Sequence, residues 1–284
     1  MALSTFDCAS FVETAKEYRG DSGSVLLMFD VDGTLKSHMD GNRNRVGRWV
    51  DKLLQALCDE PGYHVYLNTG KSRDSLIRNY RAITNLGWYG EHGALYKAPT
   101  AAYHDSEFIA YDKNWVETTK EQLKTIRNEM GYRHPNWPGR GKMDPEKLAT
   151  ITFTTKSQNH DFNDFWTRIS SELSDNDARV TYHYASGTLM EITPPDVHKG
   201  TAVEHLRDQI EHPYHLALAV GDDERDSDMF RAIKTSGITS DPYTVMITEQ
   251  AGPDTEAQYR LGHYYELLKM LQQLVPDFTD PFPV

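Results

Sequence analysis

Short apolar runs that end in carboxylates constrain the fold of this chain most. The run VLLMF at residues 25–29 precedes Asp30 and Asp32, and HLALAV at residues 215–220 precedes a glycine and two aspartates. Short continuous apolar runs are typical of strands buried on both faces, as in parallel sheets. Like charges about 4 Å apart repel by roughly 4 kcal/mol at an effective dielectric of about 20, so such strand ends favour a bound cation.

Helix and strand patterns alternate on both sides of these runs. In the first third of the chain, apolar residues at helical spacing over residues 45–59 predict a helix between the first run and a strand at 64–69. A second predicted helix at 73–83 separates that strand from another within 87–98. The same alternation resumes after about Thr193. Because strand–helix–strand order with short connections indicates a right-handed parallel sheet, we predict one Rossmann-like α/β core built from both ends of the chain.

The middle of the chain has a different pattern. A polar-faced helix is predicted at residues 114–130, a half-exposed strand at 148–155 and a hairpin over 179–193. One-faced strands of this kind, combined with helices, favour a smaller α+β cap domain inserted into the core. The predicted boundaries are 1–102 and 191–284 for the core and 103–190 for the insert.

Charge and cysteine content exclude several classes of protein. Acidic residues outnumber basic ones by 42 to 30, which opposes a general affinity for nucleic acid or an anionic membrane. Cys8 and Cys58 lack a zinc-like spacing and are expected to be reduced thiols rather than a disulfide. The sequence contains neither a signal-peptide pattern at its start nor an apolar stretch long enough to span a bilayer. We therefore expect a cytoplasmic protein.

The two acidic clusters predict a metal site. In an open parallel sheet, ligands bind beyond the carboxyl ends of the strands, so Asp30 and Asp32 should face the second cluster. That cluster comprises Asp222, Asp223, Asp226 and Asp228. Oxygen-only ligands favour a hard cation, with Mg²⁺ as the first candidate. A calcium-binding EF-hand loop is excluded, since Leu35 and Gly41 stand where it needs glycine and glutamate. A turn at a strand end could explain either cluster alone.

Two further positions could bind an anion. The segment LNTGKS at residues 67–72 ends like a phosphate-binding Walker A loop, but Val65 stands where that loop needs glycine. Thr69 still ends a predicted strand, and Gly70 leaves the backbone open beside a helix N-terminus that favours negative charge. Lys199 stands at the start of another helix, where it could supply a fixed positive charge; an ordinary solvated lysine is the alternative.

These four pieces, in this order, resemble the motifs of the haloacid dehalogenase superfamily of phosphotransferases. The matching segments are DVDGT at 30–34, Thr69, Lys199 and GDDERDSD at 221–228. YGEHGA at 89–94 and TEAQYRLGHYYELLKML at 255–271 are more narrowly similar to the trehalose-6-phosphate phosphatases. That family also carries a substrate cap between the second and third motifs, where the predicted insert lies.

The resemblance implies a Mg²⁺-dependent phosphatase that hydrolyses trehalose 6-phosphate through an aspartyl-phosphate. Asp30 would be the nucleophile, Asp32 the general acid and base, and Thr69 and Lys199 would hold the phosphoryl oxygens. The implied metal site comprises Asp30, the backbone carbonyl of Asp32 and Asp222, with Asp223 and Asp226 ordering the waters of the metal or holding Lys199. The implied substrate-binding residues are Gly70, Lys71, Glu91, His92, Gly93, Lys147 and Glu191.

Alternatives to this substrate stay open at the level of the sequence. Lys71 stands where the family usually has an arginine, and the insert matches the pattern of the family only loosely. Another sugar phosphate, such as sucrose phosphate or mannosyl-3-phosphoglycerate, would need the same chemistry. A non-catalytic regulator that binds a sugar phosphate is a third possibility. We expect a monomer that binds a small sugar phosphate, and the resemblance suggests a trehalose-6-phosphate synthase as its partner.

Overall fold

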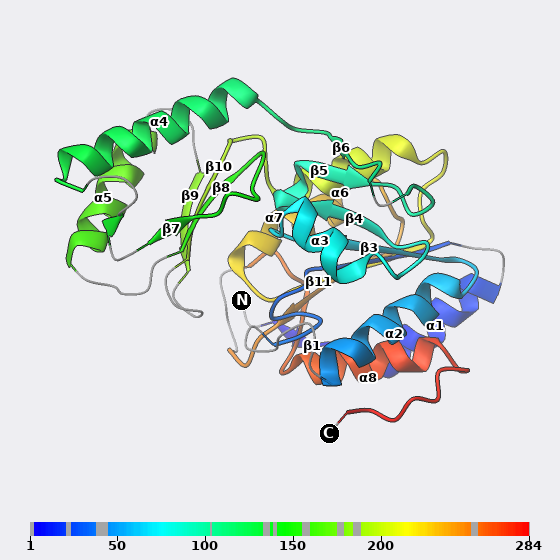
Figure 1. Ribbon diagram of the computed structural model, residues 1–284. Coiled ribbons are helices and arrows are strands. Elements are labelled where there is room, and N and C mark those ends of the chain that lie inside the picture. Colours follow the sequence, from blue (N-terminus) through cyan, green and yellow to red (C-terminus); the bar gives the residue numbers. More distant parts are fainter. Residues whose placement is uncertain are drawn as a thin grey trace. The chain divides into compact units, whose positions relative to one another are not determined.

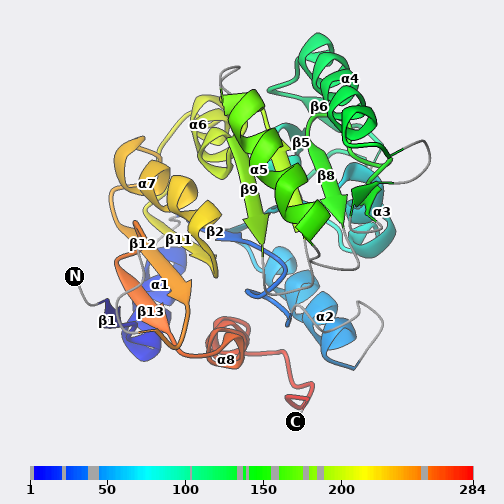
Figure 2. The same cartoon turned by 90° about the vertical axis from the view of Figure 1, so that its left-hand side faces the viewer.

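The protein divides into two compact units in a computed structural model (Figures 1 and 2). The structure describes residues 3–20, 24–37, 45–102, 104–132, 137–138, 141–154, 160–174, 179–183, 189–250 and 255–283. The core unit contains Met1–Lys71, Ser75–Ile109 and His198–Val284, and the insert unit contains Ser72–Asp74 and Ala110–Val197.

A nine-stranded sheet forms the core unit. Its order is β1 (Ser4–Thr5), β13 (Tyr259–Leu261), β12 (Pro242–Ile247), β11 (Leu216–Gly221), β2 (Val25–Phe29), β3 (Tyr63–Asn68), β4 (Gly87–Gly90), β5 (Leu95–Lys97) and β6 (Glu107–Phe108). In this order, every neighbouring pair from β1 to β4 is parallel, and the pairings of β4 with β5 and of β5 with β6 are antiparallel. The predicted parallel α/β core is confirmed.

Helices cover both faces of this sheet, which explains the continuous apolar runs. On β2, Val25, Leu27 and Phe29 join one hydrophobic core, whereas Leu26 and Met28 join a second core. Successive side chains of a strand point to opposite faces, so a strand between two cores must be apolar throughout. The first core contains α1 (Cys8–Gly20), α2 (Arg45–Asp59), α3 (Arg73–Tyr80) and α8 (Tyr264–Leu274), and the second contains α6 (Lys199–Gln209) and α7 (Ser227–Thr235).

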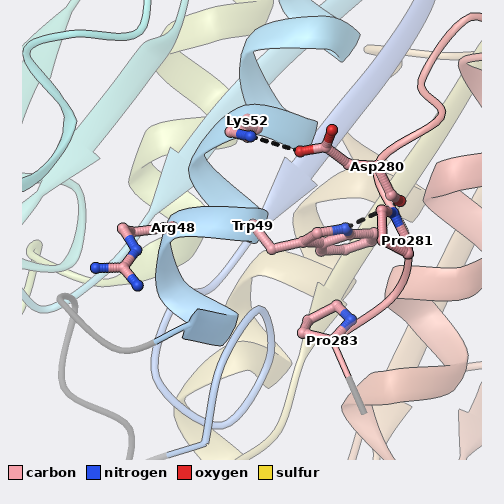
Figure 3. A pocket seen from close by; sticks show the side chains of 6 residues that line it. All are labelled: Arg48, Trp49, Lys52, Asp280, Pro281 and Pro283. Carbon is pink, nitrogen blue, oxygen red and sulfur yellow. Dashed lines mark hydrogen bonds and ion pairs between the residues drawn. The ribbon is translucent and has the colours of Figure 1, made fainter.

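The C-terminal segment lies across α2 in the core unit. The Trp49 indole donates to the backbone carbonyl of Asp280 at 3.3 Å, and Lys52 pairs with the Asp280 carboxylate at 2.6 Å. A cavity of about 270 Å³ lies between this segment and α2, lined by Arg48, Trp49, Lys52, Asp280, Pro281 and Pro283 (Figure 3). None of these residues was predicted to act in the site.

The insert unit is a four-stranded antiparallel sheet with two helices. Its strand order is β7 (Lys142–Met143), β8 (Ile151–Thr154), β10 (Leu189–Thr193) and β9 (Arg179–His183), with helices α4 (Lys113–Glu129) and α5 (His160–Ser174). Phe153, Phe162 and Phe165 form its apolar core together with residues of α4 and β10. The expected α+β insert is present, and β9 pairs with β10 as a hairpin requires, although their connection at 184–188 lies outside the described residues.

The main segment of the insert unit, Ala110–Val197, begins and ends later in the chain than the predicted insert of residues 103–190. Strand β6 pairs with β5 and therefore belongs to the core sheet, and β10 lies between β8 and β9 and therefore belongs to the insert. Both shifts come from strands at the edges of the insertion, which sequence pattern alone does not assign to a sheet. Within the part of the chain that the structure describes, no helix is long and apolar enough to cross a membrane. Cys8 and Cys58 are free thiols.

Candidate active site

The first and fourth motifs meet at the carboxyl ends of two neighbouring strands. In the parallel pairing of β2 with β11, Phe29 lies opposite Val220, and the Asp30 N–H donates to the Val220 carbonyl at 2.9 Å. Asp30 and Asp222 therefore leave the sheet at the same edge, although they are far apart in the chain. The structure brings together the two strand ends that the sequence predicted to converge.

Lys199 connects these strand ends. Its ammonium donates to Asp30 Oδ1 and to Asp226 Oδ1, each at 2.6 Å, and its side chain is only 2% exposed. Burial lowers the pKa of Lys199, but the carboxylates of Asp226 and Asp30 outweigh that effect and raise the pKa above its ordinary value. Lys199 is thus a buried, permanently charged ammonium and not a solvated surface lysine.

Asp226 is fully buried and organises the turn after β11. Its Oδ2 accepts hydrogen bonds from the N–H groups of Asp222 at 2.9 Å and Asp223 at 3.2 Å. Burial raises the pKa of the Asp226 carboxyl, and the ammonium of Lys199 opposes the rise. A Cβ atom at Gly221 would collide with the Asp226 carboxylate, so glycine is required there. Asp226 therefore supports Lys199 and the loop.

Asp32 lies two residues after Asp30 and pairs with two lysines. Lys71 contacts Asp32 Oδ2, and the ammonium of the buried Lys36 lies 3.7 Å from Asp32 Oδ1. Burial, together with the nearby charge of Lys71, lowers the pKa of Lys36, while Asp32 raises it. The chain folds back here because Gly33 adopts a positive φ of 91° and its N–H donates to the Lys36 carbonyl at 2.7 Å. The carboxylate of Asp32 is held between two cations.

The loop of the second motif is fixed by a strained turn after β4. The His92 N–H donates to the Thr69 carbonyl and the Glu91 N–H to the Lys71 carbonyl, each at 3.0 Å. Glu91, His92 and Gly93 have φ values of 48°, 60° and 98°, and all three residues are buried. Consecutive residues in the left-handed region are uncommon, and strain of this kind concentrates at functional sites. The turn brings the predicted residues 69–71 and 91–93 together.

Lys147 and Glu191 lie in the insert unit and face one another. The Lys147 ammonium is 4.0 Å from Glu191 Oε1, and the hydroxyl of Thr152 lies 3.5 Å from the same oxygen. Met190 and Ile192, the neighbours of Glu191 along β10, join the apolar core that contains α4 and α5. Glu191 therefore points to the opposite, polar face of the insert sheet, where both charged side chains are buried.

The five predicted metal-binding aspartates do not form one cluster. Within the described residues, no group of three or more His, Cys, Asp or Glu side chains is placed to share a metal ion. Asp226 is turned toward Lys199, Asp32 is held by lysines, and Asp223 caps the turn Glu224–Asp226 and accepts from Arg225 Nε at 2.8 Å. Asp30 and Asp222 are the candidate side-chain ligands that remain.

This smaller set still suits magnesium. Asp30 and Asp222 are oxygen donors at adjacent strand ends, and the Thr34 hydroxyl donates to Asp222 Oδ1 at 3.3 Å. Mg²⁺ keeps several waters and commonly takes only one or two carboxylates from a protein. The donor chemistry of the two strand-end carboxylates therefore fits the ion.

The sequence did not single out two residues that contact the predicted site. Lys36 follows DVDGTL directly and could have been noticed as a charge within a buried turn. Asn68 precedes Thr69, and its amide donates to the Lys199 carbonyl at 2.8 Å. No periodicity distinguishes Asn68 from the other residues of its strand, so only the structure reveals this contact.

Comparison with known families assigns the chain to a protein family. The family model of the haloacid dehalogenase-like hydrolases matches residues 94–238, which is half of the chain. The chain belongs to this family. The family model of trehalose-phosphatase matches residues 28–130, a range that contains Asp30, Thr69 and the Glu91–Gly93 turn. The predicted resemblance is thus confirmed.

Similar proteins carry trehalose-related names. The chain is 26% identical to a probable alpha,alpha-trehalose-phosphate synthase (UDP-forming) 11 of Arabidopsis thaliana over 89% of its own length, but it spans only 29% of that relative. It is 24% identical to a probable trehalose-phosphate phosphatase 2 of Oryza sativa subsp. japonica, covering 88% of this chain and 68% of the relative. The chain therefore corresponds to less than a third of the length of the synthase-named relatives.

Solved structures share the fold. The C-terminal domain of a C. albicans trehalose-6-phosphate phosphatase matches with a TM-score of 0.74 at 20% identity, covering 96% of this chain and 98% of that one. The C-terminal domain of a Candida albicans trehalose synthase regulatory protein matches with a TM-score of 0.70 at 16% identity, covering 95% and 99%. At these identities the likeness establishes the fold alone.

Proposed function

We propose that this protein is a phosphatase that hydrolyses trehalose 6-phosphate to trehalose and phosphate. The observation that carries the proposal is the ammonium of Lys199, held at 2.6 Å from both Asp30 and Asp226 at the carboxyl edge of the sheet. A buried lysine beside a strand-end carboxylate can neutralise an incoming phosphate while the carboxylate attacks it. Membership of the haloacid dehalogenase-like hydrolases supports this chemistry.

The proposed reaction has two steps at phosphorus. An Asp30 oxygen attacks the phosphorus atom, and the bond from phosphorus to the sugar oxygen breaks, with its electron pair passing to that oxygen. Asp32 gives its proton to the departing oxygen and then takes a proton from water. The resulting hydroxide attacks the aspartyl-phosphate, the Asp30–phosphorus bond breaks, and phosphate leaves with Asp30 regenerated as a carboxylate.

The groups around Asp30 would hold the phosphoryl oxygens. We assign this role to the Thr69 hydroxyl, the Gly70 N–H and the Lys199 ammonium. Asp30, the backbone carbonyl of Asp32 and Asp222 would hold Mg²⁺, and Asp223 and Asp226 would keep the loop and Lys199 in place. Bound magnesium would neutralise the charge of the phosphoryl group as the nucleophile approaches.

We propose that the sugar is bound by polar groups of both units. In the core unit these are Lys71, Glu91, His92 and Gly93, and in the insert unit they are Lys147 and Glu191. A buried carboxylate and a buried ammonium supply the acceptors and donors that sugar hydroxyls need. The names of the relatives also suggest a trehalose-6-phosphate synthase as a partner, and we propose a cytoplasmic location for the pair.

A non-catalytic regulator is the second candidate, because a domain of a trehalose synthase regulatory protein has the same fold. Phosphate release from trehalose 6-phosphate, with Mg²⁺ and with a chelator, separates the candidates. We expect release that the chelator abolishes. Release from sucrose phosphate or mannosyl-3-phosphoglycerate alone would reject the trehalose substrate. Binding without release from any sugar phosphate would support the regulator.

A further inference from the structure

Asn68 links three elements of the candidate site. It is the last residue of β3, it is completely buried, and it stands immediately before Thr69. Its side-chain amide donates to the backbone carbonyl of Lys199 at 2.8 Å and lies 3.6 Å from the sulfur of Met28 on β2. One short side chain therefore connects β2, β3 and the first residue of α6.

The amide of Asn68 is only half satisfied. Within the described part of the chain, its Oδ1 atom is buried without a hydrogen-bond partner. Rotating the amide by 180° would place this oxygen against the Lys199 carbonyl, so two acceptors would repel, and the donor must face Lys199. An unpaired buried carbonyl costs free energy that an apolar side chain of the same volume would avoid. The asparagine therefore occupies a position where leucine would be more favourable for stability.

The first turn of α6 must be placed accurately for Lys199 to reach both of its carboxylates. The ammonium contacts Asp30 and Asp226 at the same distance of 2.6 Å, and those two residues come from different segments of the chain. A close backbone approach by Gly93 also fixes this turn, because a Cβ at Gly93 would lie 2.8 Å from the His198 carbonyl oxygen. The bond from Asn68 to the Lys199 carbonyl acts on the lysine residue itself.

We propose that Asn68 is a positioning residue, whose amide holds the backbone of Lys199 so that the ammonium spans Asp30 and Asp226. Its catalytic consequence rests on the proposed function. The connection also joins Lys199 to Thr69, the neighbour of Asn68, so that two groups assigned to the phosphoryl oxygens share one anchor.

The test is the variant Asn68→Leu, which keeps the branching and the number of side-chain heavy atoms and removes both the donor and the unpaired oxygen. We expect kcat for trehalose 6-phosphate to fall by about 10- to 100-fold, as a small misplacement of a reacting group predicts, with KM changed by less than about threefold. The melting temperature should stay the same or rise, because the buried, unpaired oxygen of Asn68 is removed. A crystal structure of the variant should show Lys199 no longer within hydrogen-bond distance of both carboxylates.

Thr244→Val is the matched control. Thr244 is a fully buried polar residue of β12 in the same sheet, and its hydroxyl donates to Gln258 Oε1 at 3.0 Å. This variant should lower the melting temperature and leave kcat unchanged. The two variants are thus expected to give opposite patterns of stability and turnover.

Two results would overturn the role of Asn68. One is an active Asn68→Leu enzyme with kcat within about twofold of the wild type; the other is a parallel loss of melting temperature and turnover, which indicates a packing role. If the wild-type protein releases no phosphate from any sugar phosphate, the proposed function fails, but the crystal structure still decides the positioning. A Lys199 ammonium still bonded to both carboxylates in Asn68→Leu would then refute the positioning role of Asn68, and a displaced Lys199 would support that role.

Discussion

The core unit and the insert unit bury charge in different ways. In the core unit, the buried charges of the candidate site form a connected set, in which Lys199 contacts two aspartates at 2.6 Å. In the insert unit, Lys147 and Glu191 are separated by 4.0 Å on the polar face of a sheet whose other face is apolar. The closely bonded charges of the core unit suit the stabilisation of charge on a phosphoryl group. The more widely spaced pair of the insert unit suits hydrogen bonding to sugar hydroxyl groups. Under the proposed function, the core unit carries the phosphoryl chemistry, and Lys147 and Glu191 of the insert unit add to the sugar-binding groups of the core.

The largest effect is expected from Asp30→Asn. Loss of the proposed nucleophile should reduce kcat by about 10⁴-fold or more, whereas folding should be retained because Lys199 keeps Asp226 as a partner. Phosphate release measures the loss of kcat, and circular dichroism measures whether the variant is folded. Turnover close to that of the wild type would remove Asp30 from its assigned role and, with it, the proposed chemistry of the core unit.

Lys199→Met tests whether the core charges act as a set. Two buried carboxylates would lose their shared cation, so we expect destabilisation by about 3–5 kcal/mol and a loss of kcat of roughly 10²- to 10³-fold. Urea denaturation measures the first quantity and steady-state kinetics the second. Lys147→Met is the matched variant in the insert unit. An equal loss of kcat in Lys147→Met would contradict the comparison.

Glu191→Gln tests whether the insert unit contributes to sugar binding. We expect KM for trehalose 6-phosphate to rise about tenfold, because a neutral amide replaces a charged hydrogen-bond acceptor. The kcat for p-nitrophenyl phosphate, which has no sugar, should not change. The KM values for both substrates should be compared. A loss of kcat for p-nitrophenyl phosphate would place Glu191 in the chemistry instead.

A smaller effect concerns Asp51, a half-buried carboxylate of α2. Burial raises the pKa of Asp51 to about 6, and Lys36 only partly opposes this shift. Because the folded state binds the proton more tightly than the unfolded state, stability should fall as pH rises from about 4 to 6. Asp51→Asn should remove this fall, giving about 1–2 kcal/mol of added stability at pH 7 and none at pH 3. Denaturant midpoints at both pH values measure the difference, and equal gains at both would refute the explanation.

The sequence predicted those parts of the site that follow from periodicity. The apolar runs located β2 and β11, and their parallel pairing placed Asp30 beside the second acidic cluster. Orientation of the individual aspartates was not predictable, because Asp226 turns toward Lys199 only once α6 has been placed. Asn68 was missed for the same reason, whereas Lys36 could have been noticed as a charge that directly follows DVDGTL. The Lys147–Glu191 pair requires the pairing of distant segments, which the resemblance suggested but no local pattern could give.

The pairing of β2 with β11 has a consequence for the order of synthesis. Residues 110–197 of the insert unit are continuous in the chain and emerge from the ribosome before β11, the neighbour of β2. The nascent chain must therefore carry β2 with one open edge while the insert collapses nearby. A chaperone that shields exposed strands should matter most during that interval, since an unpaired apolar edge is a template for aggregation.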